Sequence, residues 1–244
     1  MALRPPLLAA AVLALTLSLW LSPTQALAAL EPGEMERLSN ERTLTRWANP
    51  NTRAPVHRAP RESSGTFARL HHYTEYRRPE IYLALKRTVD RFGRQWVKIR
   101  LPRLPNGSTG WVRRERLGPF QRVNTRLVIN RRRFRASFYR AGKRVWTSPV
   151  GVGRPGRATP SGRFWIREKL RSLEGGTIYG PLAFGTSAYS GISDWPRGGV
   201  IGVHGTNQPG LIPGRISNGC VRVPNRKIRR LGRIMPLGTP VRIR

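Results

Sequence analysis

The only cysteine in this chain of 244 residues, Cys220, lies near residues whose types could support nucleophilic chemistry. Cys220 ends the turn 217–220 (SNGC), and His204 ends the apolar segment 200–204 (VIGVH). A Gly/Pro-rich loop joins the two, so a strand-end histidine and a turn-borne cysteine can fold back onto each other. An imidazole that takes the thiol proton generates a thiolate, which attacks carbonyl carbon. We expect Gly219, which has no side chain, to let backbone amides approach the resulting oxyanion.

Short strands separated by turns are the elements expected to position these two residues. One amphipathic helix is expected after Asn225, a residue that can cap it, because four apolar residues between Ile228 and Met235 recur on one helical face. The fold of this half is therefore predicted to be mostly β with one short helix. Strands are expected at 126–130, 134–139, 144–152, 164–168, 200–203 and 239–244.

The N-terminal half has its own short strands, expected at 81–85, 95–101 and 110–112. Here Trp96 and Trp111 lie on strands beside glycine-containing turns, and the segment loosely resembles the end of a bacterial SH3-like domain. We therefore expect an SH3-like small β-barrel at 44–120, preceded by a polar linker at 29–43.

The first residues predict export. Arg4 precedes an unbroken apolar run at 7–21, and ALA at 26–28 fits the small-residue pattern of a signal-peptide cleavage site. The sequence predicts a signal peptide at 1–28, cleaved near Ala28. The alternative is an uncleaved membrane anchor, although the run is shorter than the ~20 residues that span a bilayer. In both cases the remaining chain is expected outside the cytoplasm, in a cell wall or a periplasm-like space.

An unpaired cysteine has a limited set of roles in that location. Exported proteins commonly pair their cysteines, and one left over is reactive, intermolecular or buried and inert. The residue types alone leave these alternatives open. The remaining histidines, His57, His71 and His72, have no cysteine near them in the sequence, and we interpret them as ordinary surface or turn residues.

The formal net charge is +33, and it is carried almost entirely by arginine. A field of this size favours polyanions. Nucleic acid is the first partner that such a charge suggests, but the predicted export argues against it. We expect anionic wall polymers or an acidic membrane face as partners, with surface solubility as the alternative explanation. The sequence has no metal-ligand spacing and no glycine-rich phosphate loop, so neither a metal nor a cofactor is expected.

Four motifs in one order carry a family resemblance: GVG at 151–153, TPSGRF at 159–164, GVHG at 202–205 and SNGCVR at 217–222. Together they resemble the YkuD-type L,D-transpeptidases of bacterial cell walls, over about residues 122–244. The resemblance implies attack on the third residue of a peptidoglycan stem tetrapeptide, release of D-alanine, a thioester acyl-enzyme and a 3→3 cross-link. It also implies covalent inhibition by carbapenem-type β-lactams.

The resemblance assigns roles to residues by motif. It implies that Cys220 is the nucleophile, that His204 is the general base and that the Gly205 backbone orients the imidazole. The amides of Gly219 and Cys220 would form the oxyanion hole. Arg222 would hold a substrate carboxylate or brace the site.

One departure from the family motif concerns Asn218, which stands where many members have a second histidine. Asn218 is expected to be a turn residue or a substrate contact. Ser217 is a candidate for either a turn hydroxyl or a substrate contact, and Tyr189 and Trp195 are candidates for the wall of a substrate cleft.

These observations predict two domains, an SH3-like domain at 44–120 and a YkuD-type β-sandwich catalytic domain at 121–244. The leading hypothesis is an exported L,D-transpeptidase that acts on peptidoglycan stem peptides. An L,D-carboxypeptidase, in which water replaces the acceptor amine, is the alternative within the same enzyme class. A non-catalytic cell-wall-binding protein and a secreted nucleic-acid binder are the alternatives from other classes.

Overall fold

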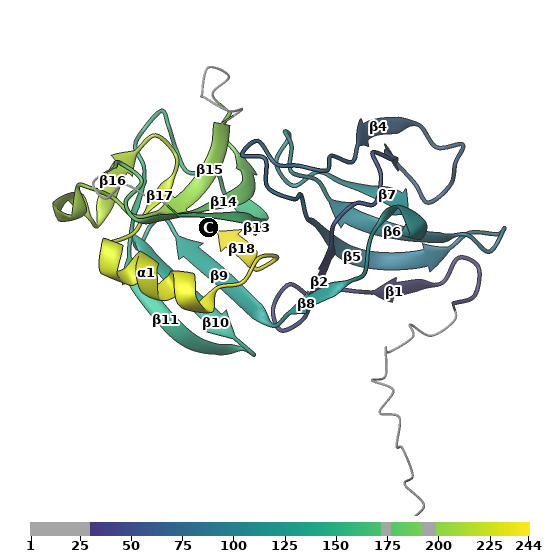
Figure 1. Cartoon of the computed structure of the whole chain (residues 1–244), viewed down its shortest axis with the longest axis horizontal. Helices are drawn as coiled ribbons and strands as arrows, with labels where there is room; N and C mark the ends of the chain where they lie inside the picture. Colours follow the sequence, from purple (N-terminus) through teal and green to yellow (C-terminus); the bar gives the residue numbers. More distant parts are fainter. Residues whose placement is uncertain (1–29, 172–176, 192–198) are drawn as a thin grey trace, which may run out of the picture.

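The computed structural model describes residues 30–171, 177–191 and 199–244. These residues form two β-sheets that lie side by side, one from each half of the chain (Figure 1). The prediction of a mostly β fold is confirmed, and α1 (Asn225–Ile234) is the one α-helix of the described part. No helix within these described ranges is long and apolar enough to cross a membrane. The predicted signal peptide at 1–28 and Trp195 lie outside them.

The N-terminal sheet has eight strands in the order β4-β3-β7-β6-β5-β2-β8, with β1 paired to β5. Its core is apolar, and Val97, Ile99 and Val112 are fully buried in it. The assignment of this domain as SH3-like stays a prediction. Its elements are β1 (Met35–Arg37), β2 (Thr45–Ala48), β3 (Pro55–His57), β4 (Thr66–Arg69), β5 (Tyr82–Val89), β6 (Gln95–Arg100), β7 (Thr109–Arg113), the 3₁₀ helix η1 (Arg114–Arg116) and β8 (Gln121–Val123).

The prediction of a linker at 29–43 is wrong for its described part. Strand β1 pairs with β5, Glu36 forms an ion pair with Arg87, and Leu38 is fully buried. The polar composition that suggested a linker belongs to an edge strand with its outer face in water. The N-terminal sheet also extends past the predicted boundary at 120, because β8 pairs with β2.

The C-terminal sheet has ten strands in the order β11-β10-β9-β18-β13-β14-β15-β17-β12-β16. The meander β9-β10-β11 and the terminal strand β18 follow the predicted segments. Its elements are β9 (Thr125–Asn130), β10 (Arg135–Arg140), β11 (Lys143–Pro149), β12 (Gly151–Gly153), β13 (Gly162–Arg171), β14 (Leu182–Tyr189), β15 (Val200–His204), the 3₁₀ helix η3 (Pro209–Leu211), β16 (Gly214–Ser217), β17 (Val221–Arg222) and β18 (Pro240–Ile243).

Strand β13 joins the two halves of this sheet, since its first residues pair with β18 and its later ones with β14. The register shifts by one residue at Arg167, because Ile166 pairs with Thr186 while Glu168 pairs with Gly185. Adjacent side chains of a regular strand face opposite sides, but at this β-bulge Arg167 and Glu168 are both buried. Residues 164–168 are all buried, so this part of β13 is covered on both faces and carries two neighbouring charged residues inside the protein.

The helix α1 follows the predicted range, but its predicted cap is wrong. Pro224 occupies the N-cap position, and no side chain caps the helix there. The Asn225 side chain instead accepts a hydrogen bond from the amide of Thr206, at 2.9 Å. Ile228 and Leu231 are fully buried on the inner face of the helix, as the apolar spacing predicts.

A small apolar core joins the two sheets. Ile81 and Leu83 of the N-terminal sheet pack with Trp165 of β13, and all three are buried. The Trp165 indole donates to the carbonyl of Ile81 at 3.1 Å. The two sheets are thus packed directly against each other rather than joined only by the chain.

Candidate active site

Parallel pairing of β15 with β17 brings the cysteine to the histidine-bearing strand. Val203 pairs with Val221 and His204 with Arg222, which continues the register so that Cys220 lies opposite Gly202. The Gly202 amide donates to Cys220 Sγ at 3.3 Å. Side chains two residues apart share one face of a strand, so His204 lies on the face that Sγ approaches. A Cβ atom at Gly202 would lie 3.7 Å from the imidazole Cδ2 and 3.9 Å from Sγ.

The backbone fixes the tautomer of His204. Its Nδ1 lies 2.6 Å from the carbonyl oxygen of Gly205, which can only accept, so Nδ1 carries the proton and donates. The lone pair is then on Nε2, the nitrogen that can act as a base. Val223 donates to the carbonyl of His204 at 2.8 Å and holds this residue against the segment after β17.

Burial keeps both groups neutral. His204 is 4% exposed, and desolvation lowers its pKa to about 4, opposed by the Gly205 hydrogen bond and assisted by the charge of Arg222. Desolvation also raises the pKa of the Cys220 thiol, while the Gly202 amide and Arg222 act in the opposite direction. Both shifts favour a thiol and a neutral imidazole at neutral pH over a thiolate–imidazolium pair.

The turn that carries Cys220 is closed by hydroxyl groups. Ser217 Oγ donates to the carbonyl of Cys220 at 2.5 Å and accepts from the amide of Gly219 at 3.2 Å. Gly219 has φ +120°, a conformation that favours glycine. The Thr159 hydroxyl donates to the Gly219 carbonyl at 2.7 Å and accepts from the Gly153 amide. The hydroxyl of Thr159 thus links the TPSG and GVG motifs to the turn that carries Cys220.

These contacts change the roles that were expected for the residues in and beside the turn that carries Cys220. Ser217 is 3% exposed and bonded inside the turn, so its position is that of a turn hydroxyl. Because the Gly219 amide is engaged by Ser217, the Cys220 amide is the stronger candidate for an oxyanion donor. Asn218 has a buried Oδ1 with no hydrogen-bond partner among the described residues. Arg222 donates to Gln208 Oε1 at 3.0 Å, so its guanidinium braces the loop after β15.

Tyr189 lies elsewhere. It ends β14, and its hydroxyl donates to Glu75 and accepts from Arg167 at 3.0 Å. Its backbone is bonded to the Asn106 side chain, with distances of 2.9 Å and 2.8 Å. Tyr189 therefore belongs to the contact between the two sheets and is not among the residues that line the cavity at Cys220.

The thiol and the imidazole open onto one cavity of about 250 Å³. The Tyr179 ring meets the His204 ring edge-on at 5.0 Å. Sequence reasoning missed Tyr76, Arg171 and Tyr179, which have no motif around them. The lining residues are Tyr76, Leu170, Arg171, Thr177, Tyr179, Gly180, Ala183, Phe184, Gly185, Val200, Gly202, His204 and Cys220.

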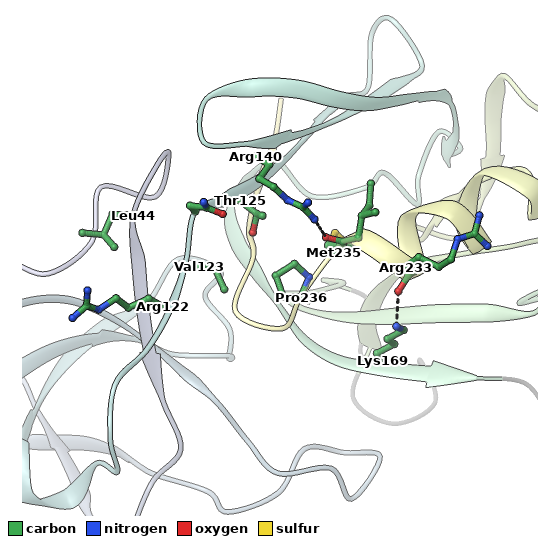
Figure 2. Close-up of a pocket in the computed structure, with 12 residues that line it drawn as sticks. Leu44, Arg122, Val123, Thr125, Arg140, Lys169, Arg233, Met235 and Pro236 are labelled. Atoms are coloured by element: carbon green, nitrogen blue, oxygen red, sulfur yellow. Dashed lines mark hydrogen bonds between the residues drawn. The ribbon is translucent and has the colours of Figure 1, made fainter. Parts of the chain in front are cut away.

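A larger cavity, of about 640 Å³, lies near the C-terminal end of α1, and its lining also includes Leu44 and Arg122 of the N-terminal half (Figure 2). It contains neither the cysteine nor a histidine. Arg140 donates to the carbonyl of Ile234 at 2.9 Å, and Lys169 to that of Gly232 at 2.5 Å. Arg122 and Arg233 are also among its lining residues, but their guanidinium groups point away from each other (Figure 2). Because this larger cavity lacks both the thiol and the imidazole, the smaller cavity is the candidate active site.

The described residues contain no group of three or more His, Cys, Asp or Glu side chains that could hold a metal ion. The candidate site consists instead of one thiol, one imidazole and backbone amides. These groups are the components of nucleophilic acyl transfer.

Comparison with known proteins agrees with this chemistry. Residues 124–243 match the YkuD family model, the L,D-transpeptidase catalytic domain. This region contains both Cys220 and His204. The probable L,D-transpeptidase ErfK/SrfK of Salmonella typhimurium is 30% identical over 163 residues, which are 60% of this chain and 52% of that protein. The Bacillus subtilis protein YkuD, which carries the L,D-transpeptidase name, is 33% identical over 97 residues, or 40% of this chain and 52% of that protein.

Among solved structures, L,D-transpeptidase 3 from Mycobacterium tuberculosis, in complex with a faropenem-derived adduct, aligns with a TM-score of 0.40 at 15% identity. The alignment covers 62% of this chain and 91% of that one. The chain spans about half the length of the first two curated relatives.

Proposed function

We propose that the protein is an exported L,D-transpeptidase that forms 3→3 cross-links between peptidoglycan stem peptides. The observation that carries the proposal is that Cys220 Sγ and a base-competent His204 line one cavity, within the region that matches the transpeptidase catalytic domain. The family match supports the reaction class. The stem peptide as substrate, the acceptor amine and the release of D-alanine are part of the proposal.

In the first half of the reaction, Nε2 of His204 takes the proton of the Cys220 thiol as sulfur attacks the carbonyl carbon of the third stem residue. The tetrahedral oxyanion accepts a hydrogen bond from the Cys220 amide. The bond to the terminal D-alanine then breaks, and the imidazolium returns the proton to the departing amine. A thioester between the stem and Cys220 remains.

In the second half, the side-chain amine of a neighbouring stem attacks the thioester. His204 takes the proton of that amine and delivers it to the departing sulfur, so that the thiol is regenerated. Nδ1 donates to the Gly205 carbonyl throughout and keeps the imidazole in one orientation. Water in place of the amine would give the carboxypeptidase reaction.

Product analysis tests this proposal. Purified protein is incubated with stem tetrapeptides, and D-alanine release and products are followed by mass spectrometry. The expected products are D-alanine and cross-linked dimers. Free tripeptides without dimers would replace the transpeptidase with a carboxypeptidase, and no D-alanine release from folded protein would overturn both activities. In the control His204→Ala, acylation is expected to fall by roughly 10²-fold or more because the general base is gone.

We also propose that anionic wall polymers bind this protein through its basic surface. The formal net charge of +33, carried almost entirely by arginine, supports this. Binding to isolated walls is expected to weaken steeply with salt, since the screening length falls to ~3 Å at 1 M. Salt-independent binding would instead favour a specific pocket, and the SH3-like domain that we propose for the N-terminal half would be the place to look for it.

Export and cleavage near Ala28 are part of the same proposal, supported by the apolar run at 7–21 and the ALA sequence. N-terminal sequencing of the protein recovered from cells tests cleavage. A mature chain that begins at Ala29 is expected, whereas a chain that begins at Met1 would point to an anchor.

A further inference from the structure

A loop of the N-terminal sheet domain, residues 73–79, reaches the cavity that contains Cys220. Tyr76 of this loop lines the cavity, although the other lining residues belong to the C-terminal half. The same cavity wall includes Leu170 and Arg171 of β13 and Ala183, Phe184 and Gly185 of β14. The N-terminal domain thus contributes one aromatic side chain to the candidate active site.

The loop has a defined shape of its own. Thr74 donates its amide to the Arg78 carbonyl at 2.8 Å, and Tyr73 forms a β-bridge with Pro79. The Thr74 hydroxyl oxygen accepts from the amides of Tyr76 and Arg78, at 3.3 Å and 3.2 Å. Arg77 takes a positive φ of 56° at the tip. These bonds hold the backbone around Tyr76 in one conformation.

Buried polar contacts anchor the loop to the strands that line the cavity. The Thr74 hydroxyl donates to Glu168 of β13 at 2.7 Å, and both residues are buried. Glu75 forms an ion pair with Arg167 at 3.1 Å and accepts from the hydroxyl of Tyr189. Arg167 also pairs with Glu80, which directly follows the loop. Arg167 and Glu168, which lie at the β-bulge of β13, thus both contact residues of the loop.

These anchors distinguish Tyr76 from its neighbours in the loop. Tyr73 is 65% exposed and is not among the lining residues of the cavity. Tyr76 is half-buried, three residues further on, between the anchored residues Glu75 and Glu80. These contacts therefore hold Tyr76 at the cavity wall, where it can contact a bound ligand, whereas Tyr73 lies outside the cavity.

We propose that the N-terminal domain is part of the substrate site, and that Tyr76 is a specificity-determining residue that packs on the stem peptide beside the bond attacked by Cys220. This inference rests on the proposed function, because a peptide acyl donor is the ligand it invokes. The cavity wall is largely apolar, with Leu170, Tyr179, Phe184 and Val200 around it. An aromatic ring there contributes contact area to an aliphatic or backbone segment of the peptide.

The expected signature is a change in substrate affinity without a change in the chemistry at sulfur. A contact made equally in the ground state and the transition state alters KM and leaves kcat unchanged. Loss of a packed aromatic ring is expected to raise KM roughly tenfold for Tyr76→Ala. Tyr76→Phe keeps the ring and is expected to stay within about threefold of wild type.

The test measures acylation of Cys220 by a stem tetrapeptide, by intact mass, as a function of peptide concentration in the full chain. The variants are Tyr76→Ala, Tyr76→Phe and the matched control Tyr73→Ala, which removes a tyrosine from the same loop. Alkylation by iodoacetamide, a small electrophile, reports the intrinsic reactivity of the thiol in each. A raised KM for Tyr76→Ala alone, with alkylation no slower than in wild type, supports the proposal.

Two results would overturn it, and they are distinguishable. If wild type is acylated and the KM of Tyr76→Ala equals that of wild type, the loop is not part of the substrate site. The proposed function then still stands. If wild type is alkylated by iodoacetamide but not acylated by the peptide, the proposed function fails and this inference fails with it. Should Tyr76→Ala not fold, Tyr76→Leu carries the same expectation of a raised KM.

Discussion

At the scale of single residues, the site is defined by two groups that burial keeps uncharged. The Cys220 thiol is shielded by the strand that carries Gly202, and His204 is held by the Gly205 carbonyl in the tautomer that leaves Nε2 as a base. A neutral pair does not store a reactive thiolate, so in the proposed reaction proton transfer accompanies attack on the carbonyl carbon. A buried neutral thiol is less reactive toward small electrophiles than an exposed thiolate.

The pH dependence of thiol alkylation tests this resting state. Because burial raises the pKa of Cys220, the rate of iodoacetamide alkylation is expected to rise with an apparent pKa above the usual value of ~8.5. The rate is measured by intact mass between pH 6 and pH 10. An apparent pKa well below that value would mean that a thiolate–imidazolium pair is the resting form.

Protonation of His204 is expected to destabilise the fold. Its folded-state pKa of about 4 lies below the unfolded value of 6.5, so the unfolded chain binds the proton more readily. The contribution of neutral His204 to the free energy of unfolding is fully present above pH 6.5. It is lost as the pH falls toward 4, and the loss amounts to about 3 kcal/mol in total. Thermal melts of wild type and His204→Gln across this range measure it. Equal pH dependence in both proteins would contradict the assignment.

Sequence reasoning located the cysteine and histidine because each has a recognisable setting, a glycine turn and a glycine-flanked strand end. It had no means to find Tyr76, which comes from the other sheet and has no motif around it. It placed Tyr189 at the cleft from its position before His204, but the contacts of its hydroxyl are with Glu75 and Arg167. Long-range packing decides such placements, and no local pattern encodes it.

At the scale of elements, the loop after β15 depends on the first residue of α1. Asn225 accepts from the amide of Thr206, a fully buried residue, and thereby holds the segment that contains the Gly205 carbonyl. Gly205 is packed tightly here, since a Cβ atom on it would lie 2.5 Å from Asn225 Oδ1. The orientation of the His204 imidazole therefore depends on the hydrogen bond between Asn225, at the start of α1, and Thr206 in the loop after β15.

Asn225→Ala is expected to leave the Thr206 amide unpaired, at a cost of about 1–3 kcal/mol in unfolding free energy. Acylation of Cys220 is expected to slow as well, because the Gly205 carbonyl is no longer held. Asn225→Asp, which keeps the acceptor oxygen, is the control. The measurements are chemical denaturation and acylation rate, and an alanine variant indistinguishable from wild type in both would refute this positioning role.

Strand β14 shows why some elements escape prediction. Its sequence, LAFGTSAY, has few β-branched residues, and it is buried on both faces apart from Ala183, so it lacks the alternation of a half-exposed strand. Its glycine, Gly185, is required by packing, because a Cβ atom there would lie 2.3 Å from Glu168 Oε1. Strands with clear turn signals at their ends, such as β9 and β10, were predictable to within a few residues.

At the scale of the whole molecule, charged residues buried between the two sheets join them. Arg167 and Glu80 are 2% and 1% exposed, and each satisfies the other. The pKa of Arg167 is raised by its hydrogen bond to Glu80 and by the charges of Glu80 and Glu75, against desolvation. The predicted strands and the two resemblances indicated two β domains, but only the structure reveals that they share a core and a buried ion pair.

Glu80→Gln is expected to lower the unfolding free energy by about 3 kcal/mol, because it leaves a buried guanidinium partly uncompensated. The control Glu115→Gln removes a carboxylate from a surface pair whose Glu side chain is 57% exposed, and about 1 kcal/mol or less is expected. Chemical denaturation compares the two. Similar small losses in both variants would show that the buried pair does not hold the sheets together.

Acylation of Cys220, on which the proposed function depends, is tested by intact-mass analysis after incubation with a carbapenem. Opening of the β-lactam ring by sulfur expels no leaving group, so the adduct adds the whole mass of the inhibitor. One adduct per chain is expected in wild type and none in Cys220→Ala. An adduct that persists in Cys220→Ala, or no adduct on folded wild type, would contradict it.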